Sequence, residues 1–272
     1  MTEIKIEHEN VFADVDTSGV APHLVTYLET VAARPEVVEL HDRATALLAP
    51  RPGERVLEVG CGLGADAREL ARAVSPGGAV TAVDVSEAML QAARERHDPT
   101  LDVTYEQADV TDLPYDDATF DVIRIERVLQ HVPDGERACA EMARVLKPGG
   151  RLLALDTDWH SLVADVGDDD LTQRVLAHAT GRMIRPRAAR HLRRLLAGAG
   201  LADVRVVPHA FAYTRLADAA VLLPMFNEEI PQEANFMADA DREPWFAAAR
   251  AADADGTFLA GWTAYVALAR KP

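Results

Sequence analysis

Apolar runs alternate with amphipathic stretches along most of this chain, beginning near residue 54. The apolar runs predict strands at 55–59, 79–83, 103–107, 120–125, 151–155, 204–207 and 258–268. Between them, apolar residues at helical spacing predict helices at 66–74, 87–96, 135–146 and from Pro186 to the glycines at 198 and 200. Such alternation with short connections predicts a parallel sheet with helices on both faces. The last two strands are expected to pair at one edge.

Two helical regions flank or interrupt this alternation. A helix before Pro50 has a stripe at Val37, Leu40, His41, Ala44, Leu47 and Leu48. Residues 216–252 carry apolar side chains that look exposed, namely Leu222, Leu223, Met225, Phe226, Phe236, Met237, Trp245 and Phe246. We therefore predict an N-terminal helical cap at 1–50 and a main domain at 51–272 with a helical lid at about 216–252. The expected fold class is α/β, a Rossmann-like doubly wound sheet, mostly parallel with an antiparallel C-terminal strand.

The net charge and the composition limit the kinds of binding partner and the compartment that can be expected. The 272 residues carry a formal net charge of −16, which repels nucleic-acid phosphate and disfavours a DNA or RNA partner. Cys61 and Cys139 lie in unrelated apolar contexts, so no disulfide is expected. The start Met1–Lys5 lacks a signal-peptide pattern, and no apolar run reaches about eighteen residues. A cytoplasmic protein without a membrane partner is predicted.

The most informative segment is the one that runs from Val56 to Gly64. Apolar residues typical of a strand are followed by glycines at 60, 62 and 64, and then by a helix. Glycine lacks a Cβ, so this turn lets backbone amides approach a ligand closely. The next strand ends in Asp84, which is placed to accept hydrogen bonds from the two hydroxyls of a ribose. The pattern predicts a nucleoside site.

Six segments extend this pattern in order along residues 50–156. They are Glu58-Val-Gly-Cys-Gly-Leu-Gly64, Asp84-Val-Ser-Glu-Ala-Met89, Ala108-Asp-Val-Thr-Asp-Leu-Pro114, Phe120-Asp-Val-Ile123, Leu129-Gln-His-Val-Pro-Asp134 and Leu146-Lys-Pro-Gly-Gly-Arg-Leu152. With them the chain resembles the class I S-adenosylmethionine-dependent methyltransferases, especially the small-molecule enzymes of bacterial secondary metabolism and quinone methylation. These motifs are specific for the fold and the cofactor and say little about the substrate.

The resemblance implies a set of contacts with S-adenosyl-L-methionine. It places Gly60 to Gly64 against the methionine part and the ribose, Glu58 near the amino group, and Asp84 on the ribose hydroxyls. It places Met89 over the adenine and Asp109 on the adenine amino group. The full cofactor-binding set is Glu58, Gly60, Cys61, Gly62, Gly64, Asp84, Val85, Met89, Asp109, Val110 and Glu126. Backbone near Glu126 is expected to line the methyl-donor end.

The resemblance also bears on the acceptor. The chain has Ile125-Glu-Arg-Val128 where enzymes that methylate nucleic-acid or protein nitrogens carry Asn/Asp-Pro-Pro-Tyr. This departure and the acidic charge favour methyl transfer to an O, N or C atom of a small, largely apolar metabolite. Three alternatives stay open: a cyclase or rearrangement catalyst that binds the cofactor without methyl transfer, a non-catalytic partner, and a nicotinamide dehydrogenase. The last usually shows Gly-x-Gly-x-x-Gly, which this turn lacks. The number of subunits is open, with a homodimer among the alternatives.

Two histidines are candidates for catalysis. His160 ends the pattern Asp156-x-Asp158-x-His160 after the fifth predicted strand, where it could accept a proton or join a metal site. A short polar loop explains the same pattern, and no metal is predicted. His131 lies in a segment where the family has histidine whatever its substrate, which favours a structural or cofactor-end role over that of a base. A base is needed only if the acceptor must be deprotonated.

Two structural interpretations are also open for several aromatic residues. Trp159 suits either the core or a pocket wall. The period-two set His209, Phe211 and Tyr213 suits either a pocket lining or one face of an edge strand.

Overall fold

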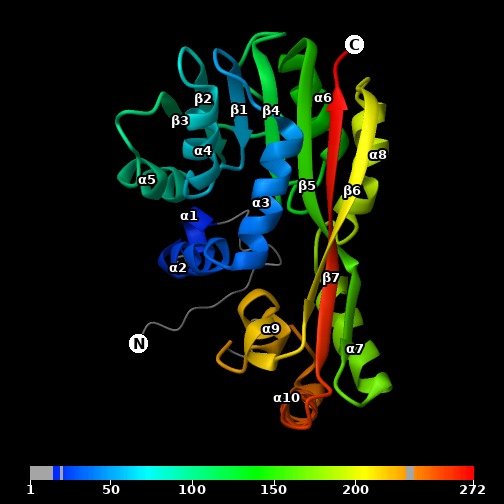
Figure 1. Ribbon diagram of the computed structural model, residues 1–272. Coiled ribbons are helices and arrows are strands. Elements are labelled where there is room, and N and C mark those ends of the chain that lie inside the picture. The colour runs from blue at the N-terminus through cyan, green and yellow to red at the C-terminus, as the bar shows by residue number, and fades with distance from the viewer. Residues whose placement is uncertain (1–14, 19–20, 231–235) are drawn as a thin grey trace.

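A computed structural model describes residues 15–18, 21–230 and 236–272. Seven strands in these residues form one sheet in the order β3-β2-β1-β4-β5-β7-β6 (Figure 1). The strands are β1 (Arg55–Val59), β2 (Ala79–Asp84), β3 (Val103–Gln107), β4 (Phe120–Glu126), β5 (Leu146–Asp165), β6 (Ala202–Tyr213) and β7 (Leu259–Arg270). Strands β1 to β5 pair in parallel, whereas β7 runs antiparallel to both β5 and β6. The predicted fold class is therefore confirmed, as is the pairing of the last two strands.

Helices cover both faces of this sheet. They are α1 (Val15–Ser18), α2 (Ala21–Ala32), α3 (Pro35–Leu48), α4 (Ala65–Val74), α5 (Glu87–Glu95), α6 (Gly135–Val145), α7 (Asp169–Gly181), α8 (Ala188–Gly198), α9 (Leu216–Leu222) and α10 (Asp239–Ala254), with a short 3-10 turn η1 (Pro224–Phe226). Three helices begin at a residue whose side chain accepts a hydrogen bond from a backbone amide of the first turn: Ser86 at α5, Asp134 at α6 and Asp168 at α7.

The period-two alternation of the central strands sends side chains to two separate cores. Val56 and Val122 join a core that also contains residues of α3 and α4. Leu57 and Ile123 point to the other face, where α6 and α8 pack. Residues 58 of β1 and 124 of β4 follow Leu57 and Ile123 directly, so their side chains point to the opposite face, which α3 and α4 cover.

Strand β5 is much longer than the predicted strand 151–155. It continues to Asp165, with a register shift against β7 between Asp158 and Val163. The lower parts of β5, β6 and β7 extend beyond the other strands, and α7, α9 and α10 surround them (Figure 1). The sequence pattern predicted a strand only as far as residue 155 and left a short polar loop as one interpretation of residues 156–160, whereas the structure continues the strand through them.

The apolar residues of the segment 216–252 are largely buried and not exposed as their pattern suggested. Those with little exposed surface are Leu222, Leu223, Met225, Phe226, Met237, Trp245 and Phe246, while Phe236 is partly buried. They belong to the same core as residues of α3 and α4. The Met1–Lys5 start and residues 231–235 of the predicted lid lie outside the described residues.

Candidate functional site

The glycine turn follows β1 and leads into α4. Gly60, Gly62 and Gly64 all have positive φ, at 71°, 50° and 69°, a region that favours glycine. A Cβ on Gly60 would lie 2.1 Å from Cγ2 of Val128, and one on Gly64 would lie 2.8 Å from the Tyr105 ring. Packing inside the chain is thus enough to require glycine at 60 and 64.

The space around Gly62 is different. The nearest atom to a Cβ there would be Cδ1 of Leu28 in α2, at 3.9 Å. The argument that glycine keeps the backbone open for a ligand therefore applies best to this position. The neighbouring Cys61 is buried, and burial raises the pKa of its thiol far above the ordinary value, which makes it a small apolar side chain and not a nucleophile.

Asp84 lies beside this turn at the carboxyl end of β2. Its Oδ2 accepts a hydrogen bond from the Gly62 amide at 2.9 Å, and its Oδ1 accepts one from the Ser86 amide at 3.0 Å. Burial raises the pKa of the Asp84 carboxyl, and these two bonds oppose that rise. The next residue, Val85, has half of its surface exposed, while Met89 is buried in α5. The structure thus brings a fixed carboxylate and an apolar surface to the edge of the glycine turn.

Asp16 of α1 joins this edge from the N-terminal helices, a contact that the sequence pattern did not reveal. Its carboxylate accepts hydrogen bonds from the Ser86 hydroxyl, from the Glu87 amide at 2.9 Å and from the Ala88 amide at 3.1 Å. A carboxylate at a helix N-terminus binds the free amides there. The N-terminal helices are thereby attached to the segment that follows Asp84.

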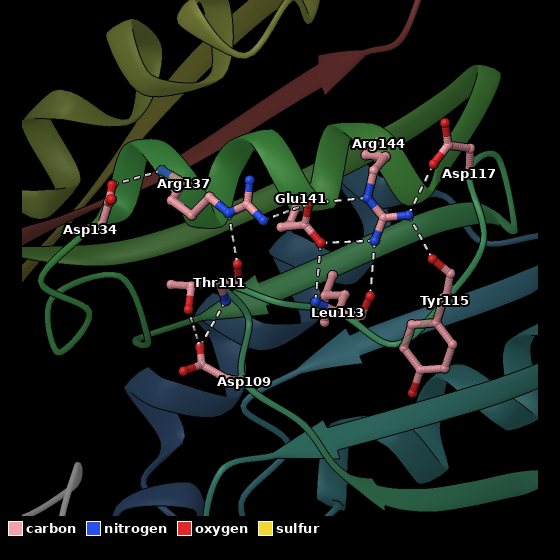
Figure 2. Close-up of polar contacts among 9 residues, drawn as sticks. All are labelled: Asp109, Thr111, Leu113, Tyr115, Asp117, Asp134, Arg137, Glu141 and Arg144. Atoms are coloured by element: carbon pink, nitrogen blue, oxygen red, sulfur yellow. Dashed lines mark hydrogen bonds and ion pairs between the residues drawn. The ribbon is translucent and has the colours of Figure 1, made fainter.

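Asp109 follows β3 and is exposed. Both hydrogen bonds from Thr111, one from its amide and one from its hydroxyl, go to Asp109 Oδ1 at 2.8 Å (Figure 2). Arg137 of α6 donates to the Thr111 carbonyl at 2.9 Å and so fixes this loop against the helix. The turn alone accounts for Oδ1, so the role of Asp109 toward an adenine stays a prediction. Val110 is buried beside it.

A buried group of charges lies on the face of β1 and β4 that α3 and α4 cover. Glu58 and Arg124 are register partners on these two strands. The Arg124 Nη1 lies 3.4 Å from Glu58 and 3.0 Å from Asp66 of α4, and its Nη2 contacts Glu126. His41 of α3 completes the group, 3.3 Å from Asp66 and 2.7 Å from Glu126. We call these five residues the charge cluster.

The members of the charge cluster titrate differently. Burial alone would lower the pKa of His41, but Asp66 and Glu126 outweigh it and raise that pKa to about 10. Burial would raise the pKa values of Asp66 and Glu126, yet Arg124 and His41 lower both below their ordinary values. Burial raises the pKa of Glu58 to about 8, because the attraction of Arg124 does not compensate for it. Among the described residues, Glu58 Oε2 has no hydrogen-bond partner.

His41, Asp66 and Glu126 also form the one group of potential metal ligands found in residues 15–18, 21–230 and 236–272, with ligand atoms within 4.8 Å of one another. Arg124 contacts both carboxylates. A guanidinium in that position already neutralises them and repels a metal ion. We assign no metal here.

His131 ends a chain of hydrogen bonds near the carboxyl end of β4 and the middle of β5. Trp159 Nε1 donates to the side-chain Oε1 of Gln130 at 2.7 Å, and the side-chain Nε2 of Gln130 lies 3.0 Å from His131 Nε2. The backbone amide of Gln130 donates to Asp156 Oδ2 at 3.0 Å. Burial lowers the pKa of His131 to about 4, so the ring is neutral at pH 7 and a weak proton acceptor. Burial raises the pKa of Asp156 to about 7.

The pattern Asp156-x-Asp158-x-His160 does not assemble into a shared site. Asp158 is buried and pairs with Arg190 of α8 at 2.7 Å, whereas Asp156 accepts backbone amides. His160 is exposed, with its Nδ1 3.5 Å from Arg187 Nη2. The position of His160 offers no support for a role as proton acceptor.

Aromatic side chains stack on the long strands below this edge. Phe211 and Tyr213 of β6 stack on Trp262 of β7, with ring centroids at 4.6 and 5.6 Å, and Trp159 of β5 stacks on Trp262 at 6.5 Å. His209 contacts Phe211 edge-on. The period-two set therefore forms one face of an edge strand, and Trp159 packs against that face.

These residues fit an S-adenosylmethionine molecule. Glu58 Oε2 is a buried carboxylate oxygen without a partner among the described residues, which suits a cationic ligand group. The oriented Asp84 carboxylate suits a diol, and the exposed Val85 offers apolar surface to a base. The set contains acceptors and apolar groups, as an adenosyl cation requires.

Comparisons with known proteins agree with this geometry. A family model described as "Methyltransferase domain" matches residues 57–154. An uncharacterised 37.1 kDa protein in transposon Tn4556 of Streptomyces fradiae is 36% identical over 252 residues, 92% of this chain and 72% of that protein. The 27-O-demethylrifamycin SV methyltransferase of Amycolatopsis mediterranei is 38% identical over 127 residues, which is 46% of each protein. The chain thus matches about half the length of this named relative.

A solved structure extends the likeness to the whole chain. The [4+2]-cyclase SpnF has 23% sequence identity and a TM-score of 0.58, and the superposition covers 96% of both chains. At this identity the likeness concerns the fold alone. In the part of the chain that the structure describes, no helix is both long enough and apolar enough to cross a bilayer.

Proposed function

Because the chain belongs to the class I S-adenosylmethionine-dependent methyltransferases, we propose that it methylates an O, N or C atom of a small, largely apolar metabolite. The observation that carries the proposal is the placement of Asp84 beside Gly62 at the carboxyl edge of the sheet, where ligands of such folds bind. The named relative is a methyltransferase of 27-O-demethylrifamycin SV. A comparable acceptor, and a place in secondary metabolism, is proposed for this chain.

Side-chain hydrogen bonds join the start of α3 to α9 and to β6. Arg34 and Glu36, at the start of α3, reach across to Asp218 of α9 at 3.1 Å and to Tyr213 of β6 at 2.8 Å. These contacts place the N-terminal helices beside the segment 216–252. These contacts support the proposal of a cap at residues 1–50 and a lid at 216–252 of the domain 51–272.

For methyl transfer, the protein has to align the acceptor atom with the methyl donor and keep water out of the site. S-adenosylmethionine, when bound, supplies an activated methyl group on a sulfonium. Asp84 is proposed to hold the ribose, Asp109 the adenine amino group, and Glu58 a cationic group of the methionine part. Aligning acceptor and donor contributes several kcal/mol to lowering the barrier, about 7–11 in favourable cases. A site closed to water favours a reaction that loses charge. Neutral His131 would act in positioning and not as a base.

Calorimetry tests the cofactor site. Wild-type protein is expected to bind S-adenosylmethionine, and Asp84→Ala to lose measurable binding. Arg96→Ala, which removes an exposed pair with Glu29, serves as the matched control and should bind like wild type. Binding by Asp84→Ala at wild-type affinity would contradict the proposed site.

Product analysis tests the reaction. Apolar phenols, quinols and demethylated polyketides are incubated with protein and cofactor, and mass spectrometry follows both products. Methyl transfer predicts S-adenosylhomocysteine together with an acceptor heavier by one CH2 unit. An acceptor that is rearranged at unchanged mass, with no S-adenosylhomocysteine formed, would instead support a cyclase, because one fold can host different reactions.

A further inference from the structure

The five residues of the charge cluster contain one more carboxylate than cations, and the partly exposed Arg127 adds a positive charge beside them, 3.5 Å from Glu126. Arg124 and the protonated His41 face Asp66 and Glu126 at 2.7 to 3.3 Å or in direct contact. The remaining carboxylate, Glu58, shares Arg124 at the longest distance of the set, 3.4 Å. Its second oxygen, Oε2, has no partner among the described residues. All five side chains are at least largely buried, so water cannot easily compensate for the unbalanced charge.

The position of Glu58 connects this imbalance with the cofactor site. Glu58 is in the strand that leads directly into the glycine turn, two residues before Gly60. Arg124 and Glu126 of β4, Asp66 of α4 and His41 of α3 are the charged groups that face it from the elements packed around it. In the free protein, burial keeps Glu58 protonated at neutral pH, because its pKa is about 8. The five buried side chains then carry two positive and two negative charges, and Arg127 lies beside them with a third of its side chain exposed to solvent.

We propose that Glu58 is a proton-exchanging residue of the cofactor site, protonated in the free protein and ionised when a cationic group of the cofactor faces Oε2. The inference rests on the proposed cofactor site and concerns how that site responds to charge. The proton leaves the Glu58 carboxyl for solvent, and the ligand cation takes its place as the counter-charge. The ligand cation is either the ammonium or the sulfonium, and both have the chemistry that Oε2 requires.

The sign of the pH dependence follows directly. A proton is released on binding when the pKa in the complex is lower than that in the free protein, so affinity rises with pH below about 8. For full ionisation in the complex, the association constant should rise about 20-fold from pH 6 to pH 7.5, and about 0.9 proton should be released at pH 7. The range stops at pH 7.5 because an α-amino group such as that of the ligand titrates near 7.7–8.0.

The test is calorimetry on the full chain in two buffers of different ionisation enthalpy, which gives the number of protons released. Three probes separate the two cations: S-adenosylmethionine has both, S-adenosylhomocysteine has the ammonium alone, and 5′-methylthioadenosine has neither. Release with the first probe alone supports the proposal with the sulfonium as partner, and the site then distinguishes cofactor from product. Release with the first two supports it with the ammonium. No release, or equal release with all three, overturns it.

Variants assign the proton to its residue. Glu58→Gln keeps the shape of the protonated side chain, so the free protein should fold and melt like wild type at pH 7, with proton release lost and affinity flat from pH 6 to 7.5. Glu54→Gln changes a carboxylate that pairs with the buried Arg151 at 2.7 Å, at the opposite edge of the sheet, and should keep the wild-type pH dependence. Asp156 also titrates near pH 7. An unchanged pH dependence in Glu58→Gln would assign the proton elsewhere and refute the proposal. Failure of the proposed cofactor site looks different, because wild type would then bind no probe at any pH, and failure of methyl transfer alone would appear in the product analysis and leave proton release unchanged.

Discussion

Arg124→Met should be among the most damaging single substitutions in this chain. Arg124 has no exposed surface, contacts Glu58, Asp66 and Glu126, and lies in the central strand β4. Methionine fills most of its volume but leaves buried carboxylates with His41 as their main counter-charge. Removing one partner of a buried ion pair costs about 3–5 kcal/mol. For a domain of this size, that loss lowers the melting temperature by roughly 6–20 °C.

The pH dependence makes this prediction specific to charge. In the wild type, Arg124 holds the pKa values of Asp66 and Glu126 below their ordinary values, so the stability that they contribute is present at neutral pH and lost only in acid. Without Arg124 these pKa values rise, and protonation relieves the penalty at a higher pH. The difference in melting temperature between wild type and Arg124→Met should therefore shrink from pH 8 to pH 5.

Melting followed by circular dichroism provides the measurement. Arg96→Met is the control, because it removes an exposed pair with Glu29 at 2.7 Å, and exposed pairs contribute only about 0–1 kcal/mol. The interpretation of the charge cluster as ionised would be wrong if Arg124→Met melted no lower than Arg96→Met. It would also be wrong if the difference in melting temperature between wild type and Arg124→Met stayed constant with pH.

Three further predictions address the packing around the site. Trp245→Ala should cost about 3–5 kcal/mol in denaturant unfolding, because this fully buried ring donates to the Met225 carbonyl; a cost below 1 kcal/mol would mean that the segment is not part of the core. Asp16→Ala should lower the free energy of unfolding by about 0.5–2 kcal/mol, because α5 loses a cap. It should also increase protease cleavage of the N-terminal helices, and unchanged cleavage would mean that Asp16 does not hold these helices to α5. Gly60→Ala should give little folded protein on gel filtration because of its 2.1 Å clash with Val128, and folding of the single variant equal to wild type would refute that packing.

Much of the architecture could be predicted from local patterns. Strands β1 and β3 begin and end where the sequence predicts. For β1 the reason is that buried parallel strands are nearly continuous in hydrophobicity, whereas β3 is a partly exposed strand at the edge of the sheet. The extension of β5 to Asp165 could not be predicted in this way. Its polar residues, such as Asp156 and Asp158, are buried through bonds to Gln130 and Arg190 that are distant in sequence. A one-dimensional pattern contains no information on such partners.

The candidate site was predictable where a motif covers it and not elsewhere. Asp84 lies at the strand end as expected. His41 counted as part of an apolar stripe, but the structure turns its ring to Asp66 and Glu126. Arg124 interrupts the apolar run of β4, and that interruption was the available signal. A buried arginine in a central strand requires carboxylate partners, and Glu58 on the neighbouring strand was the nearest candidate.

The most direct test of the account is a crystal structure of the protein with S-adenosylhomocysteine. We expect the adenosyl group at the carboxyl edge of β1 and β2, with both ribose hydroxyls within hydrogen-bond distance of Asp84. A product bound elsewhere, or an edge filled by the chain's own side chains in the presence of saturating product, would contradict it.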